Sequence, residues 1–394
     1  MVKIINKSQC CGCAACQSIC PKKCIEMKND NEGFAYPVVN EAECLNCGMC
    51  EKACPINRSE PLNNTKISAY SLISLDTKKR LKSSSGGAFS VFAEKIISNG
   101  GVVYGVAMSD DCRTAKHIKA ESIADVSKLR GSKYLQTEPM KIYEDIKACL
   151  ERKKLILFSG TTCQVNGLYG YLNHNYENLI TVDVICHGVP SPELWKKYIE
   201  HEEKTHDAKV TSVNFRHKKK GWQNFGIEKN FSGKRLWTST GKDPYMHMFL
   251  NNYCLRPSCY SCKGKELKLS DISLGDFWGV DSFTPELNDG KGTSIVLVRT
   301  ERGKKMFDSI KRDIKYREIT YEYAVKYNPA EYTSAKRPNE RDSFFNDMNS
   351  LNFSKLAEKY CKPVQVNVIK MVNRGIRYKL RILRNKFKKR MTIG

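Results

Sequence analysis

The sequence has no long apolar run. None of its 394 residues lies in a stretch that is long and apolar enough to cross a bilayer. The first residues, MVKIINKSQCCG, have neither the apolar core nor the cleavage site of a secretory signal peptide. A membrane-spanning protein and a secreted protein are both disfavoured. We therefore expect a cytoplasmic protein, in a compartment where thiols stay reduced.

Acidic residues are also scarce. The chain has 42 Asp and Glu against 66 Lys and Arg, a formal net charge of +24 at pH 7. This excess favours an anionic partner: a nucleic acid, a membrane surface, or an anionic cofactor or carrier protein. No nucleic-acid-binding motif accompanies the charge, so a nucleic acid is the least favoured of these partners.

Cysteine, in contrast, is abundant. The chain has 18 cysteines, and in a reducing compartment clustered thiols indicate metal or redox chemistry. Two runs near the N-terminus share the spacing CxxCxxCxxxCP of bacterial ferredoxins. The first run consists of Cys10, Cys13, Cys16, Cys20 and Pro21, and the second of Cys44, Cys47, Cys50, Cys54 and Pro55.

In this pattern, three close thiolates hold three irons of a cubane, and the fourth thiolate reaches the other cluster. The predicted ligands of one [4Fe–4S] cluster are Cys10, Cys13, Cys16 and Cys54, and those of the second are Cys44, Cys47, Cys50 and Cys20. Zinc is the alternative, but two complete runs with a trailing proline are not typical of zinc sites. We interpret Cys11 and Cys24, which fall outside the pattern, as spare or buried residues. Residues 1–58 thus predict a ferredoxin domain that relays single electrons.

Strand and helix patterns alternate after a polar linker at residues 59–66. Strands are predicted at residues 101–108, 155–160, 179–186, 210–218, 225–231, 234–240, 271–277 and 293–300, and helices at 140–152, at 191–204 and after the motifs SSSGG and GTTC. The alternation predicts a mixed-sheet α/β or α+β domain over residues 67–310. A C-terminal extension (311–365) and a tail (366–394) complete the multidomain chain.

A second group of thiols is spread over three loops of this domain. Cys163 follows one predicted strand, Cys186 ends another, and Cys259 and Cys262 form a CxxC pair. Loops at strand ends gather at one edge of an α/β sheet, so these four thiols are candidates for a third cubane. The alternatives are zinc, a dithiol or buried structural cysteines. Cys254 is a fifth nearby thiol and leaves the ligand set open.

Two loops without cysteine also suit a cofactor. SSSGG opens a helix whose N–H groups suit a phosphate, although the loop is neither a Walker A nor a GxGxxG motif and a helix cap is the alternative. LRGSKYLQT brings Arg130, Lys133 and Tyr134 together, which suits an anionic cofactor with a ring; a surface turn is the alternative.

Six motifs, in this order, resemble those of the family of β subunits of the coenzyme F420 hydrogenases and dehydrogenases: SSSGG, GSKYLQT, GTTCQVNGL, ICHGVPSP, LRPSCYSC and DISLGDFWG. The resemblance spans about residues 67–310, and an N-terminal two-cluster ferredoxin domain is common in this family. It implies an FAD-binding domain with a [4Fe–4S] cluster near the flavin. Carried over, the cluster positions are Cys163, Cys186, Cys259 and Cys262, and the flavin loops contain Ser85, Gly86, Gly87, Lys133, Gly160 and Thr161. Thr162 stands where the family usually has proline.

The resemblance implies an iron–sulfur flavoprotein oxidoreductase that passes electrons between clusters and FAD, because a flavin joins one-electron carriers to two-electron organic chemistry. Our main hypothesis gives it an organic substrate, in polysaccharide biosynthesis. The alternatives are an oxidoreductase that uses coenzyme F420, and an electron-transfer subunit that serves a redox partner protein.

The tail is strongly basic. Ten Lys and Arg lie between Lys370 and Arg390, and apolar residues recur every three or four positions from Val372 to Phe387. This pattern predicts a basic amphipathic helix. Such a helix suits an anionic membrane surface, which would place the protein at the inner face of the membrane; packing on its own domain is the alternative.

Overall fold

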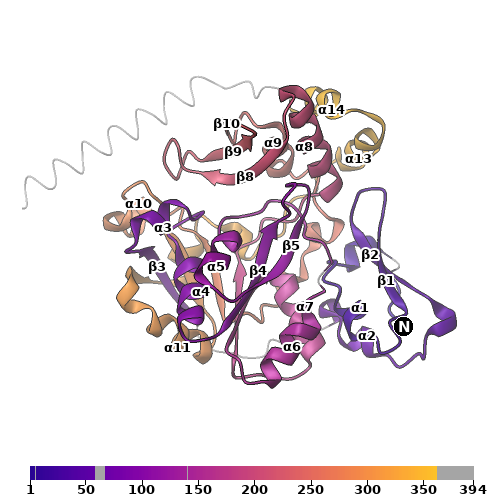
Figure 1. The fold of residues 1–394 in the computed structure, drawn as a ribbon, viewed down its shortest axis with the longest axis horizontal. Coiled ribbons are helices and arrows are strands. Elements are labelled where there is room, and N and C mark those ends of the chain that lie inside the picture. The colour runs from indigo at the N-terminus through magenta and orange to yellow at the C-terminus, as the bar shows by residue number, and fades with distance from the viewer. Residues whose placement is uncertain (5, 58–66, 140, 362–394) are drawn as a thin grey trace, which may run out of the picture.

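The structure, a computed structural model, describes residues 1–4, 6–57, 67–139 and 141–361. It contains an N-terminal module, a central eight-stranded sheet, and a smaller sheet with its own helices (Figure 1). The predicted linker at residues 59–66 and the predicted basic tail at residues 366–394 lie outside the described residues.

The N-terminal module is built from two similar halves. It contains the antiparallel strands β1 (Ile25–Asn29) and β2 (Ala35–Val39) and the short helices α1 (Ala15–Ile19) and α2 (Met49–Lys52). Each helix follows a residue with a left-handed backbone, Ala14 or Gly48, within a cysteine run. This turn folds the run back on itself and brings its cysteines together.

The central sheet has the order β13-β3-β12-β11-β7-β6-β4-β5. Its strands, in chain order, are β3 (Ser68–Ser74), β4 (Val102–Met108), β5 (Ala115–Ala120), β6 (Ile156–Thr161), β7 (Leu179–Val184), β11 (Ile272–Asp276), β12 (Ser294–Val298) and β13 (Ile314–Ile319). The four strands β4, β6, β7 and β11 are parallel, and antiparallel strands flank them on both sides. The sheet continues beyond residue 310, because β13 pairs with β3.

Alternating apolar residues cover both faces of this sheet. In β6, Leu157 packs in one cluster with Phe92 of helix α4, whereas Ile156 and Phe158 pack in another with Val165 of helix α7. The helices around the sheet are α3 (Thr77–Leu81), α4 (Ala88–Ser98), α5 (Ile123–Leu129), α6 (Tyr143–Glu151), α7 (Thr162–Leu172), α10 (Val280–Phe283), α11 (Glu301–Ser309) and α12 (Tyr321–Val325).

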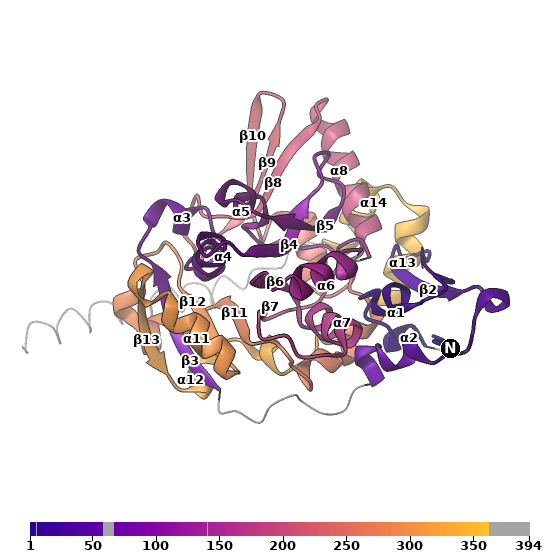
Figure 2. The same cartoon turned by 60° about the horizontal axis from the view of Figure 1, so that its bottom comes forward.

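The smaller sheet lies across one end of the central sheet, with its helices around it (Figures 1 and 2). Its antiparallel strands are β8 (Val210–His217), β9 (Gly226–Phe231) and β10 (Lys234–Ser239), in the order β10-β9-β8. The surrounding helices are α8 (Pro192–His206), α9 (Pro244–Leu250), α13 (Arg341–Ser350) and α14 (Phe353–Tyr360). They bury Trp195, Tyr198 and Tyr245 in one aromatic core.

Short 3-10 turns complete the described chain. They are η1 (Lys7–Gln9), η2 (Glu41–Glu43), η3 (Pro55–Asn57), η4 (Pro257–Ser261), η5 (Lys263–Lys265), η6 (Pro285–Leu287), η7 (Lys311–Asp313) and η8 (Pro329–Glu331). Among the described helices, none has the length and apolar character that crossing a membrane requires.

The N-terminal module packs directly on helix α7. A Cβ atom at Gly170 would lie 2.0 Å from the carbonyl oxygen of Ala53, and one at Gly167 would lie 2.9 Å from Sγ of Cys13. The Tyr143 hydroxyl adds a 2.7 Å hydrogen bond to the carbonyl of Cys13. These contacts require glycine at both positions, since any side chain would separate the module from the helix.

The mixed α/β fold and the N-terminal ferredoxin-like module predicted from the sequence are confirmed. A hairpin turn at Ser232 and Gly233 joins β9 to β10. Strands β3, β5 and β13 were not predicted, because each is an edge or near-edge strand that its neighbours stabilise.

Replacing Gly170 with alanine should destabilise the docked module. The added methyl group overlaps the backbone of Ala53, so we expect a loss of about 1–3 kcal/mol in the free energy of unfolding. Urea denaturation followed by circular dichroism measures this. Gly241→Ala is the matched control, since no atom lies within 4 Å of the added Cβ. Equal midpoints for both variants would contradict the contact.

Candidate functional site

Three of the four cysteines of the second run meet in one small cavity of the N-terminal module. Cys44, Cys47 and Cys50 line a space of about 20 Å³ together with Cys20 of the first run. This is the crossed arrangement that the sequence pattern predicts. Cys24 also lines this cavity, with its Sγ 3.4 Å from that of Cys20.

The other four ferredoxin cysteines are also neighbours. Burial raises the pKa of Cys16 to about 12, and the thiolates of Cys10 and Cys54 contribute to this rise. A hydrogen bond with the Cys11 thiol lowers the pKa of Cys13. Burial and the thiolates of Cys16 and Cys54 outweigh it, so the pKa of Cys13 is raised. The structure therefore brings together Cys10, Cys13, Cys16 and Cys54.

A third group of thiols lies where the module meets the central sheet. Cys163 lies in the first turn of helix α7, directly after β6, and Cys186 follows β7. Both thiols therefore lie at the carboxyl ends of adjacent parallel strands. With Cys259 and Cys262 they line a cavity of about 40 Å³, which we call the thiol cavity. The four candidate ligands of the third cluster thus lie together.

The fifth thiol of this cavity is Cys11 and not Cys254. Cys11 comes from the ferredoxin module and lines the thiol cavity. Cys254 is fully buried in the aromatic core around α8 and α9. The interpretation of Cys11 as a spare or buried residue, and not a ligand, stays a prediction. The sequence pattern could not reveal this place, because the neighbours of Cys11 in space come from another part of the chain.

Two cations accompany these thiols. The ammonium of Lys265 donates a 2.5 Å hydrogen bond to the carbonyl of Cys186, and Arg256 also lines the thiol cavity. Burial raises the pKa of Cys186 to about 12, while Lys265 lowers it.

Among the described residues, no three His, Cys, Asp or Glu side chains are grouped so that they could hold a single metal ion. The four thiols that line the thiol cavity stay candidate ligands of a third cubane, with zinc as the alternative.

A large cavity of about 550 Å³ lies beside the thiol cavity, at the carboxyl edge of the central sheet. Five of the six residues assigned to the flavin loops line it: Ser85, Gly87, Lys133, Gly160 and Thr161. Gly86 is not among the lining residues; its N–H donates to the hydroxyl of Ser294, and a Cβ there would lie 2.4 Å from the carbonyl of Leu72.

The N-terminus of helix α4 faces this cavity. No side chain caps it, and Ala88, Phe89 and Ser90 of its first turn line the cavity. Helix α7 differs, because Thr161 and Gln164 close its N-terminus with a capping box. Helix α4 therefore leaves the N–H groups of its first turn for an anion.

Lys133 does not present a free charge to the cavity. Its ammonium donates to the carbonyls of Lys128, Leu129 and Arg130 at the end of helix α5, and burial lowers its pKa to about 7. It therefore caps this helix and supports the loop that follows.

Arg216 is a cavity residue that sequence reasoning missed. It is buried on strand β8 between Phe225 and Trp278, with Cζ 3.7 Å and 5.4 Å from the two ring centres. Asp276, at the end of strand β11, accepts a 2.8 Å hydrogen bond from it. Arg216 reaches the large cavity because the smaller sheet packs over it. No sequence motif around Arg216 indicates this position.

His187 follows Cys186 and lines both cavities. Its Nε2 lies 2.6 Å from Oδ1 of Asn252. The structure therefore gives His187 the role of a hydrogen-bond partner.

His117 lies behind the wall of the large cavity. Its ring stacks on Phe158, neither ring nitrogen has a hydrogen-bond partner among the described residues, and a Cβ at Gly160 would lie 3.4 Å from its Nε2. Burial lowers its pKa to about 4. Below the ordinary pKa of 6.5, the unfolded chain therefore binds a proton that the folded chain does not.

The stability of the protein should fall between pH 7 and pH 5, in part because of His117. The pKa of 6.5 in the unfolded chain and about 4 in the folded chain correspond to a loss of about 2 kcal/mol over this range. His117→Leu should remove this part of the loss, as measured by urea denaturation at several pH values. His174→Leu, at an exposed histidine, is the control. A pH dependence unchanged by His117→Leu would contradict the assignment.

Comparisons with known proteins agree with this arrangement. Residues 9–57 match the 4Fe-4S dicluster domain, and residues 153–322 match the C-terminal part of the coenzyme F420 hydrogenase/dehydrogenase β subunit. The second match contains all four cysteines of the proposed third cluster but begins after the SSSGG loop.

A curated relative spans both regions. The chain is 21% identical over 330 residues to a subunit of the F(420)H(2) dehydrogenase of Methanosarcina mazei, with 81% of this chain and 87% of the relative covered. A chain of the F420-reducing [NiFe] hydrogenase complex from Methanosarcina barkeri is 16% identical, with a TM-score of 0.46, 77% of this chain and 94% of that chain covered. Residues 153–322 thus form a domain of the coenzyme F420 hydrogenase/dehydrogenase β-subunit family, and residues 9–57 form a 4Fe-4S dicluster domain that precedes it.

Proposed function

We propose that this protein is an iron–sulfur electron-transfer subunit that exchanges electrons between three [4Fe–4S] clusters and a flavin, FAD, in the large cavity. Coenzyme F420 is the proposed hydride carrier that meets the flavin there. The relative from Methanosarcina mazei is named as one subunit of an F(420)H(2) dehydrogenase, which supports an assembly with a redox partner protein.

One observation carries this proposal: the thiol cavity and the large cavity share a wall. Thr161, Cys186, His187, Gly188 and Val189 line both. Cys11 and Arg256 join the thiol cavity to the ferredoxin module on its other side. An electron that leaves the ferredoxin clusters would therefore pass the third group of thiols before it reaches the large cavity.

The large cavity suits a flavin dinucleotide in size and in chemistry. Its volume of about 550 Å³ is that of a cofactor site, and its apolar and aromatic walls suit a planar ring. The uncapped N-terminus of helix α4 would hold the pyrophosphate. When bound, a flavin accepts two single electrons and a proton, which together make one hydride for an organic acceptor.

The residues of this chain would bind and orient these groups. Arg216, whose charge is paired with Asp276, would place its guanidinium against an aromatic or polar part of the ligand, between two aromatic rings. Lys218 fixes the SSSGG loop, because its ammonium donates to the carbonyls of Arg80, Ser85 and Lys291.

The expected role in polysaccharide biosynthesis finds no support in the comparisons, and we do not propose it. The role of an electron-transfer subunit, which was the alternative, fits the named relative better. The cytoplasmic location and the membrane contact of the basic tail stay predictions.

The metal and flavin content tests the proposal most directly. Protein purified without oxygen should contain about twelve irons, a similar amount of sulfide and about one FAD per chain. Reduced coenzyme F420 should then bleach the flavin absorbance. About eight irons without flavin would contradict the proposal and leave a ferredoxin joined to a partner-binding domain.

Single cysteine variants can show whether the thiols of the thiol cavity are cluster ligands or structural cysteines. Cys259→Ala should lower the iron content by about four per chain, because it removes one ligand of the cluster in the thiol cavity. Cys254→Ala is the matched control: this thiol is close in the chain but buried in the aromatic core, so its loss should leave the iron content unchanged. Equal iron contents in the two variants would exclude a cluster at Cys259.

A further inference from the structure

Arg256 is a fully buried arginine between the ferredoxin module and the thiol cavity. Its Nε donates a 2.7 Å hydrogen bond to the carbonyl of Cys10, and its Nη2 lies 3.5 Å from the Sγ of the same cysteine. Nη2 also donates to the carbonyl of Ala35 at 2.9 Å, and Nη1 donates to Oε1 of Gln136 at 3.1 Å. The guanidinium is thus held in place from several directions.

The backbone around Arg256 makes room for this contact. Gly12 has a φ of +72°, and a Cβ there would lie 2.8 Å from Nη1 of Arg256. On the other side, the carbonyl of Arg256 accepts a 2.9 Å hydrogen bond from the N–H of Cys259. One residue therefore touches a predicted ligand of the first ferredoxin cluster with its side chain and a predicted ligand of the third cluster with its backbone.

A buried guanidinium requires a negative partner, since an unpaired buried charge costs several kcal/mol. No carboxylate of the described residues forms an ion pair with Arg256. Its polar partners are carbonyls, an amide and the Cys10 thiol, with the Tyr36 ring centre 4.3 Å from Cζ. The thiolates and the cluster that they hold are the remaining source of negative charge.

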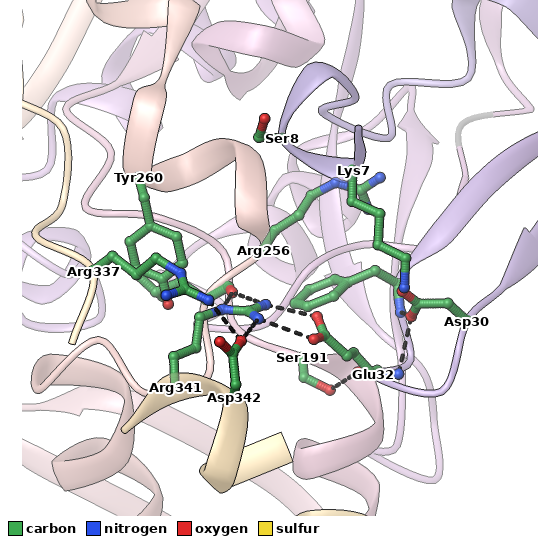
Figure 3. Close-up of polar contacts among 12 residues, drawn as sticks. Lys7, Ser8, Asp30, Glu32, Ser191, Arg256, Tyr260, Arg337, Arg341 and Asp342 are labelled. Atoms are coloured by element: carbon green, nitrogen blue, oxygen red, sulfur yellow. Dashed lines mark hydrogen bonds and ion pairs between the residues drawn. The ribbon is translucent and has the colours of Figure 1, made fainter. Parts of the chain in front are cut away.

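A second buried arginine in the same interface, Arg341, does have a carboxylate partner. Arg341 donates through both terminal nitrogens to the carboxylate of Glu32, at 2.9 and 2.6 Å. Figure 3 shows this pair face to face, whereas Arg256 extends toward the segment that carries Lys7 and Ser8. Arg341 therefore has its counter-charge in the protein, and Arg256 does not.

We propose that Arg256 is a positioning residue that sets the reduction potential of the cluster on Cys10 and so directs electrons between the ferredoxin module and the thiol cavity. The inference rests on the proposed clusters. Reduction adds one electron from a neighbouring cluster, with no bond made or broken, and leaves one more negative charge near Cys10. A fixed positive charge and an N–H···S contact stabilise this state and raise the potential.

The test is a redox titration of the whole protein, followed by electron paramagnetic resonance. Arg256→Gln should lower the midpoint potential of one cluster by about 59 mV, a tenfold change in its one-electron reduction equilibrium, with the iron content unchanged. Arg256→Lys, which keeps the charge, should restore part of this shift. Arg341→Gln is the matched control and should leave all potentials unchanged.

Gln136→Glu provides an independent variant that leaves Arg256 in place. It puts a carboxylate on Nη1 and neutralises the guanidinium, so the same potential should fall. If Arg256→Gln loses iron, this variant tests in its place whether Arg256 sets the potential of the cluster. Full iron with unchanged potentials in Gln136→Glu, or an equal shift in Arg341→Gln, would overturn the role of Arg256. Wild-type protein without the expected iron would instead overturn the proposed function.

Discussion

The close contact between helix α7 and the ferredoxin module is the constraint on which the redox arrangement depends. Gly167 and Gly170 bring the helix backbone against Cys13 and Ala53 without an intervening side chain. Because Cys163 lies in the first turn of the same helix, this contact also fixes the distance between the module and the thiol cavity. Electron transfer requires such fixed, short separations, and a helix packed through glycine provides them with little freedom to move.

The central sheet supplies the second half of the arrangement. Parallel strands β6, β7 and β11 end at one edge, where Cys163, Cys186 and Asp276 lie. The smaller sheet then covers this edge with Arg216 and Phe225. The large cavity is therefore closed by elements from both sheets, which explains why its residues are spread over most of the chain.

The two buried arginines that contact the N-terminal module have different partners. Arg341 and Glu32 form a complete ion pair that holds the β1–β2 turn, as does the hydrogen bond from Ser191 to the carbonyl of Glu32. Arg256 has only neutral groups and thiols around it. Arg256 thus lies beside predicted cluster ligands without a carboxylate partner. Its positive charge is close to the group whose own charge changes when the cluster is reduced.

The sequence by itself predicted the ferredoxin ligands and most strands and helices, and it revealed the resemblance to the family, because cluster spacing, period-two apolar patterns and ordered motifs are local signals. Cys10 and Cys54, for example, could be assigned to the same cluster from the spacing alone. The tertiary structure decided the rest. It placed Cys11 in the thiol cavity and Cys254 in the core, gave Lys133 a capping role, and brought Arg216 and Arg256 to the two cavities. These outcomes depend on contacts between residues far apart in the chain, which no local pattern encodes.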